Sequence, residues 1–183
     1  ILEKKNNALT KFAKVQCVMG TGGGRGPSLN QGAALAQGRI LTFLHADTRL
    51  VQHWNVAILE AFIEAEDSPR ITVNSCAFYF AIDTTPNGLN GGPDPPGIRA
   101  IERTANWRTH WFHLPYGDQC LSIPQHVFEF IGGFPDQCLM EDYELVRLLR
   151  QRVATLGERL AILELPAYCS PRRWQTLGVF YVT

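Results

Sequence analysis

The chain has 183 residues and carries 17 basic and 17 acidic side chains, so its formal net charge at pH 7 is zero. This balance argues against a general nucleic-acid binder and against a polybasic membrane-surface protein, because both need an excess of positive charge. Apolar residues make up 45% of the chain, which is enough to bury the core of one domain and excludes disorder of the whole chain.

The first half of the chain alternates predicted strands and helices. Residues 15–18 favour a short strand, 20–27 form a glycine-rich turn, and a helix is expected from Ser28 until Gly38 ends it. The apolar run 40–44 predicts a buried strand, and a strand that directly follows a helix indicates a parallel sheet. Apolar residues at helical spacing predict a helix over 51–66, and 71–82 favours a long strand.

Residues 83–97 hold eight Gly or Pro in fifteen positions, which predicts a loop or insertion. A helix carrying Trp107 and Trp111 is expected over 98–113, a strand over 118–123, and a short helix over 124–131. A helix over 141–152, a strand over 160–165 and a last helix from Trp174 complete the order. This order predicts an α/β fold with a mixed sheet in one domain.

The cysteines are widely spaced, at Cys17, Cys76, Cys120, Cys138 and Cys169, and no C-x-x-C pair occurs. A zinc ribbon is therefore not expected, and we expect reduced thiols and a cytoplasmic location, either free or at the cytoplasmic face of a membrane. The sequence has no apolar run long enough to span a bilayer and no signal peptide. It begins with Ile1, so we expect a piece of a longer protein, whose other segments leave membrane association open.

The first candidate for chemistry is His45-Ala46-Asp47, which directly follows the apolar run 40–44. Ligands of open α/β sheets bind beyond the carboxyl ends of strands, and a carboxylate there can hold a divalent metal that bridges a diphosphate. The alternative is structural: Asp47 caps the following helix and His45 packs. The spacing alone leaves both interpretations open.

Two further candidates lie nearer the carboxyl end. Glu141-Asp142 opens a predicted helix and is either a general base or simple charge at a helix N-terminus. Arg172-Arg173-Trp174 could clamp phosphates and stack a sugar or base, or form a solvated basic turn with an anchoring Trp. For each pair taken alone, the structural interpretation is favoured.

Other features are weaker. The glycines before Asn30 match neither a P-loop nor G-x-G-x-x-G, so a turn is the simplest interpretation. The isolated histidines are more often surface or core residues than ligands; these are His53, His110, His113 and His126. No Ser-His-Asp or Cys-His set is visible in the sequence.

Taken together, three stretches resemble the GT-A fold glycosyltransferases of glycosyltransferase family two. They are GRGPSLNQGAALAQGRILTFLHADTRL, YGDQCLSIPQHVFEFIGGFPDQCLMEDYELVRLLR and YCSPRRWQTLG. The chain most resembles the branch that has His-Ala-Asp in place of Asp-x-Asp and is often encoded near radical-SAM enzymes. The resemblance implies a Rossmann-like mixed sheet flanked by helices over 1–183, without the family's first strand-helix unit, and with an unusually long loop at 83–97 on the acceptor side.

The resemblance also implies roles for individual residues. Asp47 would hold Mn²⁺ or Mg²⁺ on the diphosphate of a nucleotide-sugar, and Asp142 would be the catalytic base, with Glu141 beside it on the acceptor side. The turn at 132–134 (Gly132, Gly133 and Phe134) would shape the acceptor pocket. The donor would contact Arg25, Asn30, His45, Arg172, Arg173 and Trp174. His45 stands where most relatives have Asp, so its role stays open, and Ser170 replaces the Gln of processive relatives, which argues against a polymer-making enzyme.

The leading hypothesis is therefore an inverting, metal-dependent glycosyltransferase that moves a sugar from a nucleotide-sugar to a hydroxyl acceptor, with no nucleic-acid partner. One alternative is a nucleotidyltransferase on a similar fold, which has no need of a base at Asp142. Another is a non-catalytic module that binds a sugar or a partner. Retention of Asp47, Asp142 and the Arg-Trp pair argues against the non-catalytic module.

Overall fold

The computed structural model describes residues 16–20, 22–66, 72–85, 96–137 and 139–179. Within these ranges one mixed sheet has the strand order β1-β4-β3-β5-β2. Its strands are β1 (Ile40–Phe43), β2 (Thr48–Leu50), β3 (Val73–Ile82), β4 (Leu121–Pro124) and β5 (Arg159–Cys169). Only β3 and β5 pair in parallel; the other pairings are antiparallel.

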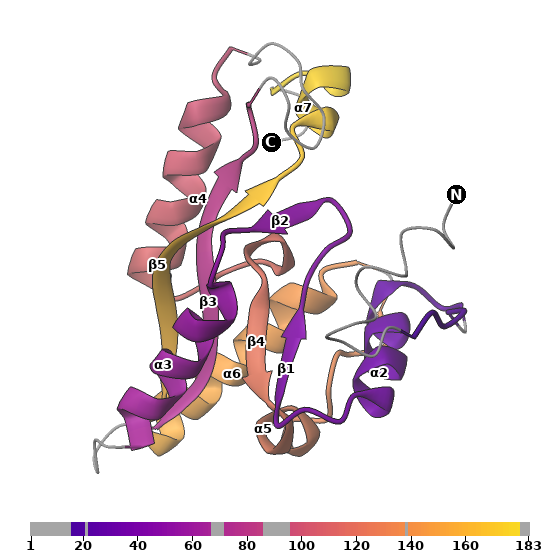
Figure 1. Ribbon diagram of the computed structural model, residues 1–183, viewed down its shortest axis with the longest axis vertical. Coiled ribbons are helices and arrows are strands. Elements are labelled where there is room, and N and C mark those ends of the chain that lie inside the picture. Colours follow the sequence, from indigo (N-terminus) through magenta and orange to yellow (C-terminus); the bar gives the residue numbers. More distant parts are fainter. Residues whose placement is uncertain (1–15, 21, 67–71, 86–95, 138, 180–183) are drawn as a thin grey trace.

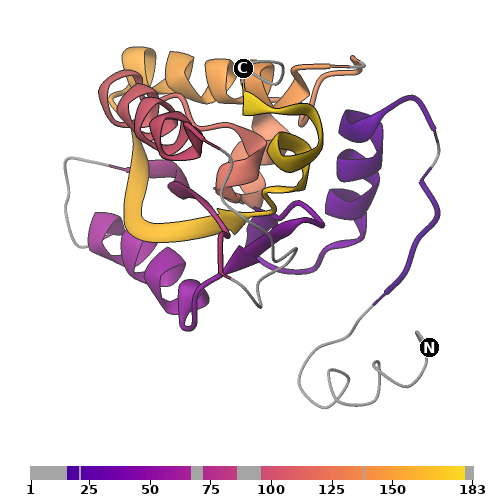
Figure 2. The same cartoon turned by 90° about the horizontal axis from the view of Figure 1, so that it is seen from above.

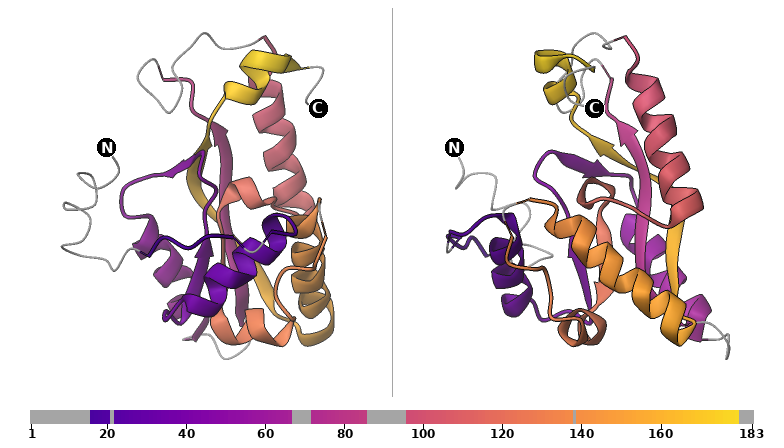
Figure 3. Two further views of the ribbon diagram at one scale, coloured as in Figure 1. Left: turned by 90° about the vertical axis from the view of Figure 1, so that its right-hand side faces the viewer. Right: turned by 180° about the vertical axis from the view of Figure 1, so that it is seen from behind.

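Helices cover both faces of this sheet. The helical elements of the described ranges are α2 (Arg25–Leu35), α3 (Trp54–Glu66), α4 (Ile98–Phe112), η1 (Gly117–Gln119), α5 (Gln125–Phe130), α6 (Glu141–Leu156) and α7 (Arg172–Leu177). Figure 2 shows α4 and α6 on one side of the sheet and α3 on the other. Figure 3 shows α2 beside α6, and α7 lies above the end of β5 (Figure 1). No helix of the described ranges is both long and apolar enough to cross a membrane.

The core follows the apolar faces of these helices. On one side of the sheet Leu145, Val146 and Leu149 of α6 are buried against β4 and neighbouring strands. On the other side Ile58 and Ala61 of α3 are buried against β3 and β5. The i, i+3, i+4 spacing of these residues places them on one face of each helix, so burial of that face fixes each helix on the sheet.

Most of the elements predicted from sequence are confirmed, with different bounds. The helix over 98–113 is α4, the strand over 71–82 is β3 from Val73, and the helices over 124–131 and 141–152 are α5 and α6. The strand over 160–165 is part of the longer β5, and the last helix begins two residues before Trp174. The mixed α/β fold is therefore confirmed, as a sheet flanked by helices.

Four expectations are wrong. Residues 16–18 form no strand, and α2 begins at Arg25 because Pro27 fits the first turn of a helix, where it costs no hydrogen bond. The run 40–44 is not a buried parallel strand: β1 ends the sheet order and is antiparallel to β4. Residues 117–119 form the turn η1 before β4, and β2 occupies 48–50 where no strand was expected. Most of the loop 83–97 and Cys138 lie outside the described residues.

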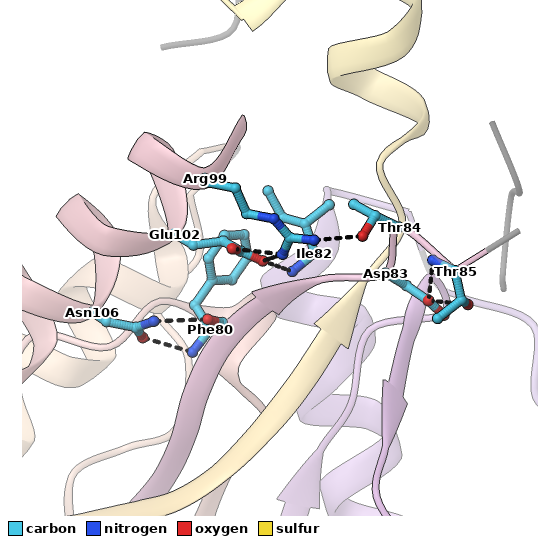
Figure 4. A network of polar contacts seen from close by, with 8 residues as sticks. All are labelled: Phe80, Ile82, Asp83, Thr84, Thr85, Arg99, Glu102 and Asn106. Atoms are coloured by element: carbon cyan, nitrogen blue, oxygen red, sulfur yellow. Dashed lines mark hydrogen bonds and ion pairs between the residues drawn. The ribbon is translucent and has the colours of Figure 1, made fainter. Parts of the chain in front are cut away.

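Side chains of α4 cover the exposed edge of β3 where β4 does not pair with it (Figure 4). Asn106 Oδ1 accepts the Phe80 N–H at 2.8 Å, and Asn106 Nδ2 donates to the Phe80 carbonyl at 2.8 Å. Glu102 Oε1 accepts the Ile82 N–H at 2.7 Å and is itself held by Arg99 at 3.0 Å. The helix thus supplies the hydrogen bonds that a neighbouring strand would make.

The strand directions bring several loops to one edge of the sheet. Because β1 and β3 are each antiparallel to β4, and β3 is parallel to β5, β1, β3 and β5 run the same way. All three strands point upward in Figure 1, where α7 lies above the end of β5. Open α/β sheets bind ligands beyond such an edge, so this is where a site is expected.

Candidate active site

A cavity of about 240 Å³ lies at this edge. It is lined by Arg25, His45, Asp47, Tyr116, Asp118, Asp142, Cys169, Ser170, Arg172, Arg173 and Trp174. These residues come from the start of α2, the loop after β1, the η1 turn, the start of α6 and the segment from the end of β5 into α7. The structure therefore brings together three segments that were separate candidates in the sequence.

The pairing of β2 with β5 joins the Asp47 loop to the arginine segment. Thr48 lies opposite Cys169, and its hydroxyl is 3.1 Å from the Cys169 sulfur. The Ser170 N–H donates to the Asp47 carbonyl at 2.9 Å. This ladder holds the Asp47 carboxylate and the guanidinium groups of Arg172 and Arg173 around one cavity.

Backbone donors orient the Asp142 carboxylate. Its Oδ2 accepts the Gly117 N–H at 2.9 Å and its Oδ1 accepts the Tyr143 N–H at 2.8 Å. A Cβ on Gly117 would lie 2.7 Å from His45 Nε2 and 3.1 Å from Asp142 Oδ2, so only glycine allows this close approach. Each carboxylate oxygen keeps a second lone pair, and the Asp142 side chain is 15% exposed, so it remains able to bind a ligand.

Glu141 takes a different position from its neighbour. Its side chain is 1% exposed, forms an ion pair with Arg25 Nε, and does not line the cavity. The same Arg25 extends Nη2 to within 3.7 Å of Asp142 Oδ2. A Cβ on Gly26 would lie 2.8 Å from the Pro135 carbonyl oxygen and 3.4 Å from Glu141 Cβ, so the start of α2 is held close to the start of α6. Glu141 thus anchors Arg25, which lies between two carboxylates.

His45 lies partly buried beside Gly117. Burial lowers its pKa and the nearby Arg25 lowers it further, against the opposite effects of Asp47, Asp142 and Glu141. The imidazole is therefore neutral at neutral pH, which is the form that accepts a hydrogen bond or binds a metal ion.

The arginine segment has one anchored and two exposed side chains. Trp174 packs edge-on against Phe80, with ring centroids 6.2 Å apart, and belongs to a core cluster with Ile82 and Ile98. Arg172 and Arg173 precede it in the first turn of α7 and are exposed. The Trp therefore fixes the turn, and the two guanidinium groups extend along the cavity.

Asn30 and the turn at 132–134 lie elsewhere. Asn30 Nδ2 donates to the Phe134 carbonyl at 2.8 Å, and Asn30 Oδ1 accepts the Phe134 N–H at 2.9 Å. Asn30, Gly132 and Gly133 line a separate cavity of about 460 Å³ between α2 and α5. Both hydrogen-bonding groups of Asn30 thus join α2 to this turn, away from the Asp142 cavity.

Sequence reasoning did not predict four residues that line the cavity, Tyr116, Asp118, Cys169 and Ser170. Arg108 stacks on the Tyr116 ring, 3.6 Å from its centroid. Burial raises the pKa of Asp118 to about 6, although Arg108 opposes the shift. The polar run Tyr116–Gln119, directly before an apolar strand, could have indicated a loop at the site. The predicted strand over 118–123 included Asp118, so this residue was not considered as a ligand-binding residue.

The residues present fit a cation that arrives with a diphosphate. Among the residues that the structure describes, no three His, Cys, Asp or Glu side chains gather as metal ligands. The exposed carboxylate of Asp47 and the neutral imidazole of His45 both line the cavity. Mg²⁺ is commonly held by one or two carboxylates together with substrate phosphates, and Asp47 supplies one such carboxylate.

Comparison with known proteins supports the fold. No protein-family model matches the chain, and no curated protein sequence matches it. Among solved structures, the chain is similar to the mannosyltransferase PcManGT from Pyrobaculum calidifontis, determined in complex with GDP-Man and Mn²⁺. The TM-score is 0.52 at 15% identity, over 92% of this chain and 42% of that one. The chain therefore has a glycosyltransferase-like fold and spans less than half of that structure.

Proposed function

We propose that the protein is an inverting, metal-dependent glycosyltransferase that moves a sugar from a nucleotide-sugar to a hydroxyl acceptor. The observation that carries this proposal is that one cavity is lined both by the Asp142 carboxylate, which backbone N–H groups orient, and by the side chains of Arg172 and Arg173. The fold it shares with a mannosyltransferase solved with GDP-Man and Mn²⁺ adds support.

In this proposal Asp142 is the general base. The acceptor hydroxyl donates its hydrogen bond to the Asp142 carboxylate, which takes the proton as the acceptor oxygen attacks the anomeric carbon. The bond from that carbon to the diphosphate oxygen breaks in the same displacement, which inverts the configuration. Gly117 and Tyr143 hold the carboxylate in a fixed orientation through their N–H groups, so the base is positioned before the acceptor binds.

The leaving nucleoside diphosphate takes the electron pair and needs positive charge beside it. Arg172 and Arg173 supply that charge, and a guanidinium matches the geometry of phosphate oxygens. A divalent cation bound with the diphosphate, held by Asp47 with His45 as a second ligand, would supply Lewis-acid stabilisation of the leaving group. Arg25 positions Asp142 and is fixed in turn by Glu141, so Glu141 acts through Arg25.

The test is a transfer assay that measures release of nucleoside diphosphate from UDP-, GDP-, dTDP- and CDP-sugars in the presence of Mn²⁺ and simple hydroxyl acceptors. We expect Asp142→Asn to reduce the rate roughly a hundredfold or more, since a positioned base contributes 10²–10⁴. The matched control is Glu144→Gln, which changes another acid in the first turn of α6 that pairs with Arg147. A variant Asp142→Asn with full transfer activity would contradict the base assignment, and nucleotidyl transfer by this variant would favour the alternative enzyme class.

A further inference from the structure

Asp118 carries an oxygen atom with unmet hydrogen-bonding capacity. Its Oδ1 is buried and has no hydrogen-bond partner among the residues that the structure describes. It is the one buried side-chain oxygen or nitrogen in these ranges with that property. A buried polar atom without a partner costs free energy, so its retention calls for an explanation.

The position of Asp118 is fixed by its neighbours. Gln119, which is fully buried, accepts from the Thr109 hydroxyl at 2.9 Å and donates to the Phe78 carbonyl at 2.9 Å. Gln119 Oε1 also accepts the Tyr116 N–H at 3.1 Å, which closes the η1 turn on itself. The side chain of Asp118 is therefore held at the cavity by a turn anchored to α4 and β3.

The same turn places Asp118 between the proposed base, Asp142, and the loop that carries the proposed metal ligand, Asp47. On one side, the N–H of the preceding residue, Gly117, binds Asp142. On the other side, the Asp118 carbonyl lies 3.8 Å from the Cys169 sulfur, and the next residue, Ser170, binds the Asp47 loop. A ligand that reaches from Asp47 to Asp142 therefore passes Asp118.

The chemistry of that part of the ligand follows from charge. A carboxylate repels phosphate oxygens, whereas the guanidinium groups of Arg172 and Arg173, which also line the cavity, attract them. Asp118 suits a neutral group that donates hydrogen bonds, and a sugar hydroxyl is such a group. We propose that Asp118 binds a hydroxyl group of the sugar being transferred and so contributes to the selection of that sugar; this inference rests on the proposed function.

The test separates binding of the sugar from binding of the nucleotide. Titration calorimetry with Mn²⁺ would compare UDP, GDP and dTDP with UDP-glucose, GDP-mannose and dTDP-glucose for the parent chain, Asp118→Ala and Asp118→Asn. We expect Asp118→Ala to leave the Kd of the nucleoside diphosphate within about twofold, and to weaken the sugar form roughly tenfold or more, as expected for a hydrogen bond to a charged group. Asp118→Asn keeps an acceptor oxygen and nearly the same volume. We therefore expect its Kd for the nucleotide-sugar to lie between the values for the parent and for Asp118→Ala.

Two outcomes would overturn this inference, and they can be told apart. If the parent chain binds none of these ligands, the proposed function fails and this inference with it. If the parent binds them and Asp118→Ala or Asp118→Asn weakens both forms equally or neither, the proposed function stands and the sugar assignment is overturned. The matched control is Asp136→Asn, an exposed carboxyl that does not line the cavity, which should behave as the parent.

Discussion

Two polar regions of this molecule use similar residues in opposite ways. In the α4–β3 network, Asn106, Glu102 and Arg99 meet backbone groups of β3 and one another, and α4 is fixed on the sheet (Figure 4). In the cavity, by contrast, Asp47 is exposed and Asp118 has a buried oxygen without a partner among the described residues. Satisfied polar groups stabilise a fold, whereas polar groups held without partners are typical of a binding site.

The largest expected effect on stability lies beside the cavity, at the ion pair between Arg25 and Glu141. Arg25→Ala removes the partner of Glu141, whose side chain is 1% exposed, so a buried charge loses its counter-ion. We expect a loss of about 3 kcal/mol in the free energy of unfolding, measured by urea denaturation. The double variant Arg25→Met with Glu141→Leu removes both charges, so its free energy of unfolding should lie close to that of the parent. A loss in the double variant equal to that in Arg25→Ala would contradict a structural role for the ion pair.

A smaller loss is expected inside the α4–β3 network. Asn106→Leu leaves the N–H and the carbonyl of Phe80 without their partners and should cost about 2 kcal/mol. Thr104→Ala, an exposed change on the same helix, is the control and should cost less than about 0.5 kcal/mol. Binding of nucleoside diphosphates at the cavity should be unchanged in both; weaker binding in Asn106→Leu would show that the two regions are not independent.

A third expected effect is a pH dependence that originates in the cavity. Burial raises the pKa of Asp118 from 3.8 to about 6; Arg108 opposes this shift, and Asp142 and Asp47 add to it. Between these values the folded chain binds more protons than the unfolded one, so this group's contribution to stability falls as pH rises from about 4 to about 6. We therefore expect Asp118→Asn to have a higher Tm than the parent at pH 7, with a difference that shrinks toward pH 4. The same difference in Tm at pH 7 and at pH 4 would contradict a raised pKa of Asp118.

The sequence predicted those parts of the molecule that depend on local periodicity. The i, i+3, i+4 spacing in α6 led to the correct helix, and the run before Asp47 led to a strand at the right position but with the wrong pairing. The cavity contains Asp47, Asp142, Arg172 and Arg173 as one group. Their grouping was expected only from the family resemblance, since nothing local links residues so far apart in the chain.

What the sequence could not provide are contacts made over long range. The short strand β2 exists because Thr48 pairs with Cys169, and Asp118 reaches the cavity because Gln119 is anchored to Phe78 and Thr109. In the same way, nothing local distinguishes Glu141 from Asp142; the difference comes from Arg25, more than a hundred positions away. Tertiary contacts of this kind override local pattern.

We propose that the cavity binds a nucleoside diphosphate together with a divalent cation. The most direct measurement is the thermal midpoint of the chain with UDP, GDP, dTDP or CDP, each with and without Mn²⁺, for the parent and for Asp47→Ala. Because binding to the native state raises the midpoint, we predict an increase with at least one nucleotide that requires Mn²⁺ and is lost in Asp47→Ala. No increase with any of the four, or one that persists in Asp47→Ala, would contradict the claim.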